Sequence, residues 1–173
     1  MARGFVTPPA TRSDWATPPA LFRRLHEEFK FDLDACASDW NCKLGEFVSL
    51  ETDSLSTSWT FYRRRDRRPV RAVWLNPPYG DGPHMRRWMR KAAIESWCGL
   101  TVVCLIHART CTEWWHNWVM PFACELRLFR GRIWFENENG PRSPAGAPSV
   151  LVVYRPGVKG PPALTTMRVS RWG

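Results

Sequence analysis

The sequence has no long hydrophobic stretch. Its longest run without Asp, Glu, Lys or Arg extends only from Ser96 to Ala108 and contains a histidine, which is too short to cross a bilayer. The N-terminus, Met1–Phe5, lacks the apolar core of a secretory signal peptide. Both absences favour a soluble protein, and we expect it to act in the cytoplasm, without contact to a membrane.

Spacing typical of metal ligands is also missing. The six cysteines form no Cys-x-x-Cys pair, and the four histidines are scattered along the chain. Because nothing indicates an oxidising compartment, we expect buried thiols rather than disulfides or zinc ligands. The sequence therefore predicts no metal site.

Acidic residues are outnumbered. There are 16 Asp and Glu against 25 Lys and Arg, giving a formal net charge of +9. This surplus favours a nucleic-acid partner, since basic side chains release counterions from a phosphate backbone. A basic protein that binds nothing in particular is the alternative at this point.

One segment concentrates this charge, with six arginines in the nine positions from Arg63 to Arg71. Like charges repel within a helix or strand, so we expect a loop. It either contacts a phosphate backbone or is simply solvated; the candidate DNA contacts are Arg63, Arg64, Arg65, Arg67 and Arg68.

With 173 residues, the chain has the length of one domain. We expect a flexible arm over 1–14, a folded domain over 15–156 and a loose tail over 157–173. Apolar periodicity predicts a helix after Thr17, which would cap it, and further helices over 84–97 and 110–119. Strands are predicted over 31–36, 47–50, 70–75, 101–106, 124–129, 131–135 and 149–154, and a mobile segment over 136–148.

This order of elements predicts an α/β fold with a mainly parallel sheet and an antiparallel edge. Ligands of such sheets bind beyond the carboxyl ends of the strands. Asp34 and Asn76 each follow a predicted strand, so we expect both at one rim of the sheet. Asp39 and Asp81 are interpreted as solvated turn residues.

The segment Asn76-Pro77-Pro78-Tyr79 carries the sharpest chemical signal. Two prolines after an apolar strand stop the hydrogen-bond ladder and hold a rigid turn. Such a turn presents the Asn76 amide oxygen and the Pro77 carbonyl as two acceptors for an exocyclic NH2 group, and Tyr79 offers a ring for stacking on a base. A plain turn with a core tyrosine is the competing interpretation.

With these residues the chain resembles the S-adenosylmethionine-dependent amino-methyltransferases, and more closely the small phage-type, Dam-like DNA N6-adenine methyltransferases. The resemblance extends from Trp15 to about Tyr154. Its motifs are Trp15-Ala-Thr-Pro18, Phe31-Asp-Leu-Asp-Ala-Cys-Ala37, Asn41-Cys-Lys43, Asp53-Ser-Leu55 with Trp59, Asn76-Pro-Pro-Tyr79, Ala108-Arg109 and Gly131-Arg-Ile-Trp-Phe135.

The resemblance implies a single Rossmann-like methyltransferase domain and a role for each motif. Asn76, Pro77, Pro78 and Tyr79 would form the catalytic turn, with the methyl passing directly to an adenine turned out of DNA. Double-stranded DNA is favoured and single-stranded DNA is possible; the oligomeric state is left open. The implied residues for S-adenosylmethionine are Trp15, Thr17, Pro18, Asp34, Ala35, Asp53 and Leu55. Arg109 and Arg132 match family arginines, and for both residues phosphate contact and structural pairing are open as roles.

One departure concerns the turn after the first strand, where many methyltransferases have a Gly-rich sequence and this chain has Ala37-Ser-Asp-Trp-Asn41. Alternative functions are methylation of cytosine N4, RNA or a protein amide by the same fold, or a catalytically silent DNA-binding protein. No segment is left over for a separate target-recognition domain, so we expect a short or relaxed recognition site.

Overall fold

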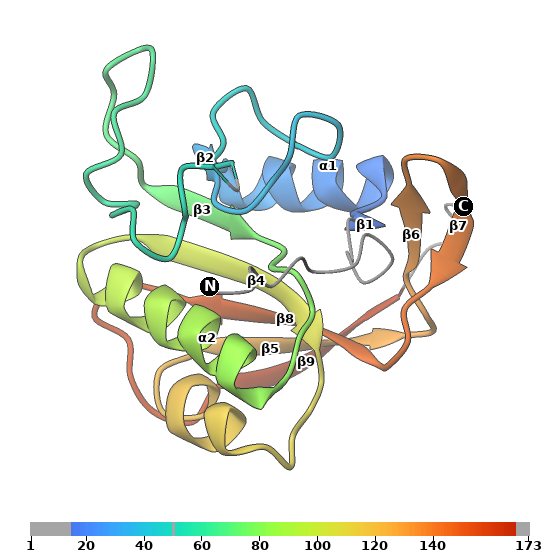
Figure 1. The fold of residues 1–173 in the computed structure, drawn as a ribbon. Coiled ribbons are helices and arrows are strands. Elements are labelled where there is room, and N and C mark those ends of the chain that lie inside the picture. The colour runs from blue at the N-terminus through green and yellow to red at the C-terminus, as the bar shows by residue number, and fades with distance from the viewer. Residues whose placement is uncertain (1–14, 50, 169–173) are drawn as a thin grey trace, which may run out of the picture.

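The structure, a computed structural model, describes residues 15–49 and 51–168. Its main sheet has six strands in the order β2-β3-β4-β8-β5-β9. Figure 1 shows α1 on one face of this sheet and α2 with η2 on the other. The strands are β2 (Leu33–Asp34), β3 (Ala72–Leu75), β4 (Thr101–His107), β5 (Glu125–Arg130), β8 (Ser149–Tyr154) and β9 (Ala163–Arg168). The helices are α1 (Pro19–Phe29), α2 (Gly82–Trp97) and the π-helical η2 (Trp115–Val119).

The sheet is mainly parallel, as expected. β2, β3 and β4 pair in parallel, and so do β5 and β9. The antiparallel strand is β8, which lies inside the sheet between β4 and β5. Strand positions alternate between the two faces: Val73 and Leu75 join the core under α2, whereas Ala72 and Trp74 join the core under α1. Burial on both faces is the reason why these strands read as continuous apolar runs.

α1 buries Phe22, Leu25 and Phe29 as its periodicity predicts, but Thr17 does not cap it. The N-cap residue is Pro18, because a residue that precedes a proline is held in an extended conformation and Pro19 follows directly. The Thr17 hydroxyl is buried and has no hydrogen-bond partner within the described structure.

A second sheet of three strands, in the order β1-β6-β7, stands beside the carboxyl ends of β3 and β4 (Figure 1). Its strands are β1 (Trp15–Ala16), β6 (Trp134–Asn137) and β7 (Gly140–Pro144). The expectation of a mobile segment over 136–148 is wrong, because β6 and β7 pair as a hairpin and β1 pairs with β6. These backbone hydrogen bonds join segments distant in sequence, which local composition does not reveal.

Three further expectations differ from the structure. Residues 163–168 of the expected loose tail form β9, which pairs with β5 along its whole length. Of the strand expected over 47–50, Phe47 makes only an isolated bridge to Asp34, and residue 50 lies outside the described residues. The helix expected over 110–119 is reduced to η2. The arm expected over 1–14 also lies outside the described residues.

The described ranges contain neither a candidate membrane-spanning helix nor a candidate metal-binding cluster. Neither α1 nor α2 nor any other helix there is long and apolar enough to span a membrane. No three His, Cys, Asp or Glu side chains gather there in a way that would hold a metal ion.

Candidate active site

Three neighbouring parallel strands end at one rim of the main sheet. β2 ends at Asp34, β3 ends immediately before Asn76, and β4 ends at His107. Asp34 lies opposite Trp74 and Leu75 opposite Cys104, so the strand ends are adjacent. The sequence predicted this placement for Asp34 and Asn76 from the direction of the strands alone.

The Asn76 side chain is oriented by the small sheet. Its Nδ2 donates a hydrogen bond to the Trp15 carbonyl at 3.3 Å. The amide oxygen Oδ1 accepts one from the Tyr79 hydroxyl at 3.4 Å, a long and therefore weak bond. Since the nitrogen is the end held by β1, the oxygen is the end that acts as an acceptor.

Two other aromatic rings pack against Tyr79. His107 stacks on it with the ring centroids 4.0 Å apart and the planes 12° from parallel. Phe135 of β6 meets it edge-on at 6.1 Å and 73°. Burial raises the pKa of Tyr79 well above its usual value, so the phenol stays protonated. Sequence reasoning missed His107, whose one signal is its position at the end of an apolar strand.

The other side of the turn rests on α2. Nε2 of His84 lies 3.1 Å from the Pro78 carbonyl and accepts a hydrogen bond from Trp88 Nε1 at 3.1 Å. Asp81, expected to be a solvated turn residue, is the N-cap of α2 and accepts a hydrogen bond from the His84 backbone N–H at 2.9 Å. A Cβ on Gly80 would lie 2.8 Å from His84 Cδ2, so the close packing needs glycine there.

Asp34 shapes the turn after β2. Its carboxylate accepts hydrogen bonds from the backbone N–H groups of Cys36, at 3.4 Å, and Lys43, at 3.0 Å. Asn41 Oδ1 accepts one from the Ser38 backbone N–H at 2.7 Å. Side-chain acceptors thus hold a turn that many methyltransferases build from glycines. Burial raises the pKa of Asp34 to about 7 in spite of these hydrogen bonds.

The Asp53–Leu55 segment is attached to the same turn. Ser54 is buried, donates a hydrogen bond to the Ala35 carbonyl and accepts one from Trp59 Nε1 at 2.9 Å. Asp53 is exposed in a left-handed conformation, φ 48°, and accepts from Ser56 Oγ at 2.7 Å and from the Leu55 backbone N–H at 3.2 Å. Asp34, Ala35, Asp53 and Leu55 therefore belong to one connected region.

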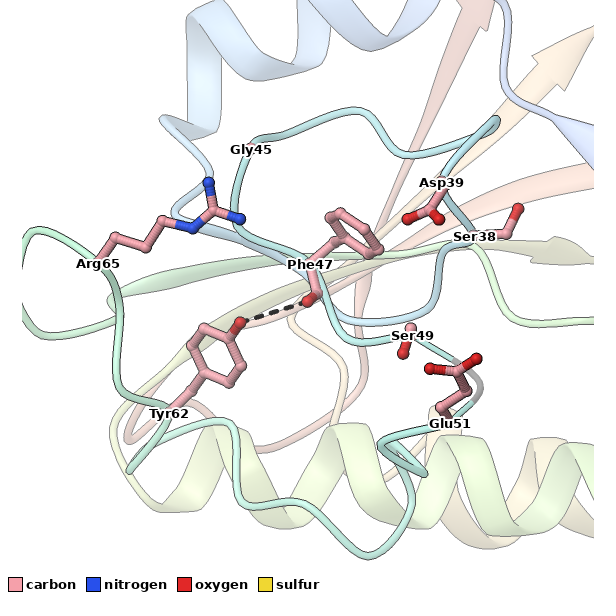
Figure 2. A pocket seen from close by; sticks show the side chains of 8 residues that line it. All are labelled: Ser38, Asp39, Gly45, Phe47, Ser49, Glu51, Tyr62 and Arg65. Atoms are coloured by element: carbon pink, nitrogen blue, oxygen red, sulfur yellow. Dashed lines mark hydrogen bonds between the residues drawn. The ribbon is translucent and has the colours of Figure 1, made fainter.

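A hollow of about 360 Å³ lies on the β2 side of this region. Figure 2 shows carboxylates at one end of it and the Tyr62 and Arg65 side chains at the other. The Tyr62 hydroxyl donates to the Phe47 carbonyl at 3.3 Å (Figure 2). The lining residues are Ser38, Asp39, Gly45, Phe47, Ser49, Glu51, Tyr62 and Arg65. The sequence marked Arg65 as a candidate DNA contact and none of the eight as a cofactor-binding residue.

The candidate DNA-binding arginines fall into two groups. Arg109 follows β4 and Arg132 precedes β6, and both lie near enough to His107 for their charges to affect its pKa. The loop of residues 63–68 instead leads into the amino end of β3, opposite to Asn76 (Figure 1). In that loop Arg64 forms ion pairs with Asp32 and Asp66, so it is occupied within the fold.

The fold is consistent with the class of amino-methyltransferases that the sequence resembles. It is a mainly parallel sheet, with the Asn-Pro-Pro-Tyr turn and the buried carboxylate of Asp34 at its carboxyl rim. The sequence profile of the family described as DNA N-6-adenine-methyltransferase (Dam) matches residues 5–171. The chain belongs to this family of adenine-specific DNA methyltransferases.

Two curated phage proteins are similar to it. The chain is 30% identical over 147 residues to a DNA N-6-adenine-methyltransferase of Haemophilus phage HP1, covering 82% of this chain and 78% of that protein. It is 38% identical over 78 residues to a DNA N-6-adenine-methyltransferase of Escherichia phage T1. The second match covers 44% of this chain and 29% of the relative.

Proposed function

We propose that the turn Asn76–Tyr79 transfers a methyl group from S-adenosylmethionine to the N6 amine of adenine in DNA. The observation that carries this proposal is the hydrogen bond from Asn76 Nδ2 to the Trp15 carbonyl. It leaves Oδ1 as the acceptor at the rim. An amine has two hydrogens to donate, and the Pro77 carbonyl is the second acceptor.

The chain's own residues supply binding and orientation. Accepting both N–H groups at Asn76 Oδ1 and Pro77 O draws the amine nitrogen out of conjugation with the ring and directs its lone pair at the donor. Tyr79 stacks on the base, a contact worth about 1–3 kcal/mol. The mechanism needs no covalent intermediate. The methylated amine is acidic enough to lose its proton to water.

The residues around Asp34 suit S-adenosylmethionine, whose sulfonium supplies the methyl group when it is bound. The Asp34 carboxylate suits its cationic amino-acid end, and Ala35, Trp15, Thr17 and Pro18 are the further contacts that we propose for it. The hollow of Figure 2 suits its adenosine, because Asp39 and Glu51 accept hydroxyl hydrogen bonds and Phe47 and Tyr62 offer rings. Asp53 and Leu55 flank Ser54, whose hydrogen bond to the Ala35 carbonyl attaches them to the same region.

We further propose that this is one Rossmann-like domain. It includes the residues 15–156 expected from the sequence and is extended by β9. Arg109 and Arg132 would contact phosphates beside the flipped adenine of double-stranded DNA. Turning the adenine out of the duplex costs a few kcal/mol. Arg63, Arg65, Arg67 and Arg68 would bind the backbone further away.

The test is to incubate the protein with methyl-labelled S-adenosylmethionine and unmethylated DNA, and to identify the labelled nucleoside. We expect N6-methyladenine, and no label with Asn76→Ala. Asn117→Ala is the matched control, because Asn117 is an exposed asparagine of η2. Label on cytosine N4, on RNA only, or undiminished label with Asn76→Ala would contradict the proposal.

The DNA methylated in this experiment also tests which recognition sequence the protein requires. Sequencing the methylated positions should give a short or relaxed site, and a long, strictly read site would contradict that expectation. Calorimetry with S-adenosylmethionine separates the alternative of a silent DNA-binding protein, which would bind DNA but not the methyl donor.

A further inference from the structure

We propose that His107 is a positioning residue for methyl transfer. Its ring supports one face of Tyr79, so that the opposite face is held where it stacks on the target base. This inference rests on the proposed function of the Asn76–Tyr79 turn, and it assigns His107 a task that the family motifs do not include.

The rings of His107 and Tyr79 are stacked. Centroids 4.0 Å apart with planes 12° from parallel make a full face-to-face contact. Tyr79 lies on a connecting turn, whereas His107 is the last residue of β4, where it pairs with Ser149 of β8. β4 and β8 are both inner strands of the six-stranded sheet. A ring fixed to the centre of a sheet is a rigid support for a ring on a turn.

No hydrogen bond at Nε2 fixes the His107 imidazole within the described structure. His107 Nε2 is buried and makes no hydrogen bond within the described ranges, and the same is true of the neighbouring Ser149 hydroxyl. Buried polar atoms are usually paired, and this nitrogen is an exception. The orientation of the His107 ring therefore does not depend on a hydrogen bond at Nε2. Its ring contact with Tyr79 is the interaction that the structure does show.

Charged groups around the ring stack affect the protonation of His107. Burial lowers the pKa of His107 below its usual 6.5, and the charges of Arg109 and Arg132 lower it further. The other titratable group that faces it is the neutral Tyr79 phenol. At neutral pH the stack therefore joins two uncharged rings. Protonation at acid pH would add a cation beside two arginines and weaken the support.

The experiment compares His107→Phe, which keeps a flat ring, with His107→Ala, which removes it. His116→Ala, an exposed histidine of η2, is the control. We expect His107→Ala to lower kcat about 2- to 12-fold, the range of an aromatic pair. When 2-aminopurine replaces the target adenine, its fluorescence in the complex with His107→Ala should differ from that with the wild type, because the base is stacked differently. The Kd for S-adenosylmethionine should stay constant. His107→Phe should keep most of the wild-type kcat at pH 8.

The pH profile separates positioning from simple stability. At saturating S-adenosylmethionine, the ratio of wild-type kcat to that of His107→Phe should fall once pH drops below the lowered pKa of His107, because only the wild type carries a protonatable ring at this position. A ratio that rises with acidity would overturn the proposal. The proposal would also be overturned if His107→Ala kept the wild-type kcat and the wild-type 2-aminopurine fluorescence. An equal loss of kcat in His107→Ala and His107→Phe would overturn it as well.

These outcomes differ from a failure of the proposed function. If Asn76→Ala methylates adenine as well as the wild type, the turn is not the site, whatever the His107 variants do. If Asn76→Ala is inactive and His107→Ala is normal, the site stands and only the role of His107 is wrong. Should His107→Ala fail to fold, the pH ratio of the folded His107→Phe variant still decides.

Discussion

Asp34 is a carboxyl group that is buried at the end of β2 and still receives two backbone hydrogen bonds. Hydrogen bonds to the ionised form lower a pKa and burial raises it. Burial prevails here, and the pKa is raised to about 7 from an ordinary 3.8. The charge of this residue therefore changes near neutral pH, next to the turn that we assign to S-adenosylmethionine.

This shift makes the stability contribution of Asp34 depend on pH. The folded state holds the proton more tightly than the unfolded chain, so the stabilisation is complete below about pH 4 and is lost as pH rises through about 7. The free energy of unfolding of wild type relative to Asp34→Asn should thus fall between pH 4 and pH 8, by up to about 4 kcal/mol. Urea denaturation at several pH values measures it, and a flat or rising difference would contradict the shift.

At the scale of single elements, the turn between β3 and α2 is held from both sides. β1 and β6 contact Asn76 and Tyr79, and α2 contacts Pro78 and Gly80 through His84. Two prolines stiffen the turn itself. Its position is therefore a property of three elements that pack around it.

Gly80→Ala tests this packing. The added Cβ would lie 2.8 Å from His84 Cδ2, and His84 lies against Trp88 and Pro78. We expect a loss of stability of about 1–3 kcal/mol and lower methyltransferase activity. Gly82→Ala is the matched control, because a Cβ there meets nothing within 4 Å. Equal activity of the two variants in a labelled-methyl assay would show that the contact has no effect on the turn.

Glu95 of α2 connects a second segment to the core. It is buried, forms an ion pair with Lys91 at 2.7 Å, and accepts hydrogen bonds from the Trp59 and Thr60 backbone N–H groups at 3.0 Å each. Burial alone would raise its pKa, but the hydrogen bonds from Lys91, Thr60 and Trp59 together lower it below 4.5. Trp59 in turn contacts Ser54, which contacts Ala35.

Removing Glu95 should therefore affect both stability and cofactor binding. Glu95→Ala leaves Lys91 and two backbone N–H groups without their acceptor, and we expect a loss of about 3–5 kcal/mol in the free energy of unfolding. Calorimetry on the folded fraction should show weaker S-adenosylmethionine binding. Glu113→Ala, at an exposed site, should change stability by less than about 0.5 kcal/mol. A similar small change for Glu95→Ala would refute the role of this contact.

At the scale of the whole molecule, the positive charge is divided between two ends of the sheet. Arg109 and Arg132 lie near the rim that carries Asn76, and the loop of residues 63–68 lies at the opposite end (Figure 1). Arg64 is held by two carboxylates, whereas Arg63, Arg65, Arg67 and Arg68 are exposed. Arg65 also lines the hollow of Figure 2, so replacing the other three tests a salt-sensitive contact with a phosphate backbone without altering that hollow.

Replacing Arg63, Arg67 and Arg68 with glutamine should flatten the salt dependence of DNA affinity. Each lost phosphate contact lowers the slope of log K against log salt by about 0.9, so we expect a decrease of about 1 to 3. The kcat at saturating DNA should not change, because the loop is remote from Asn76. The control removes the same charge from Arg23, Arg24 and Lys30, exposed residues of α1 and its C-cap that lie outside the loop. An unchanged slope in the loop variant would exclude the contact.

The sequence by itself determined the α/β class, the order of the main helices and strands, and the common rim of Asp34 and Asn76. Each depends on local periodicity or on strand direction, which neighbouring residues fix. It also led to the methyltransferase family, since several motifs stand in the family's order.

Only the tertiary structure decided the rest. β9 and the β6–β7 hairpin exist because segments far apart in sequence share backbone hydrogen bonds, and neither segment has a strong pattern of its own. The ion pair of Arg64 with Asp32 also joins residues that are far apart in the sequence. Above all, the Trp15 carbonyl on Asn76 and the His107 ring under Tyr79 join residues from separate strands, and no spacing along the chain indicates that they meet.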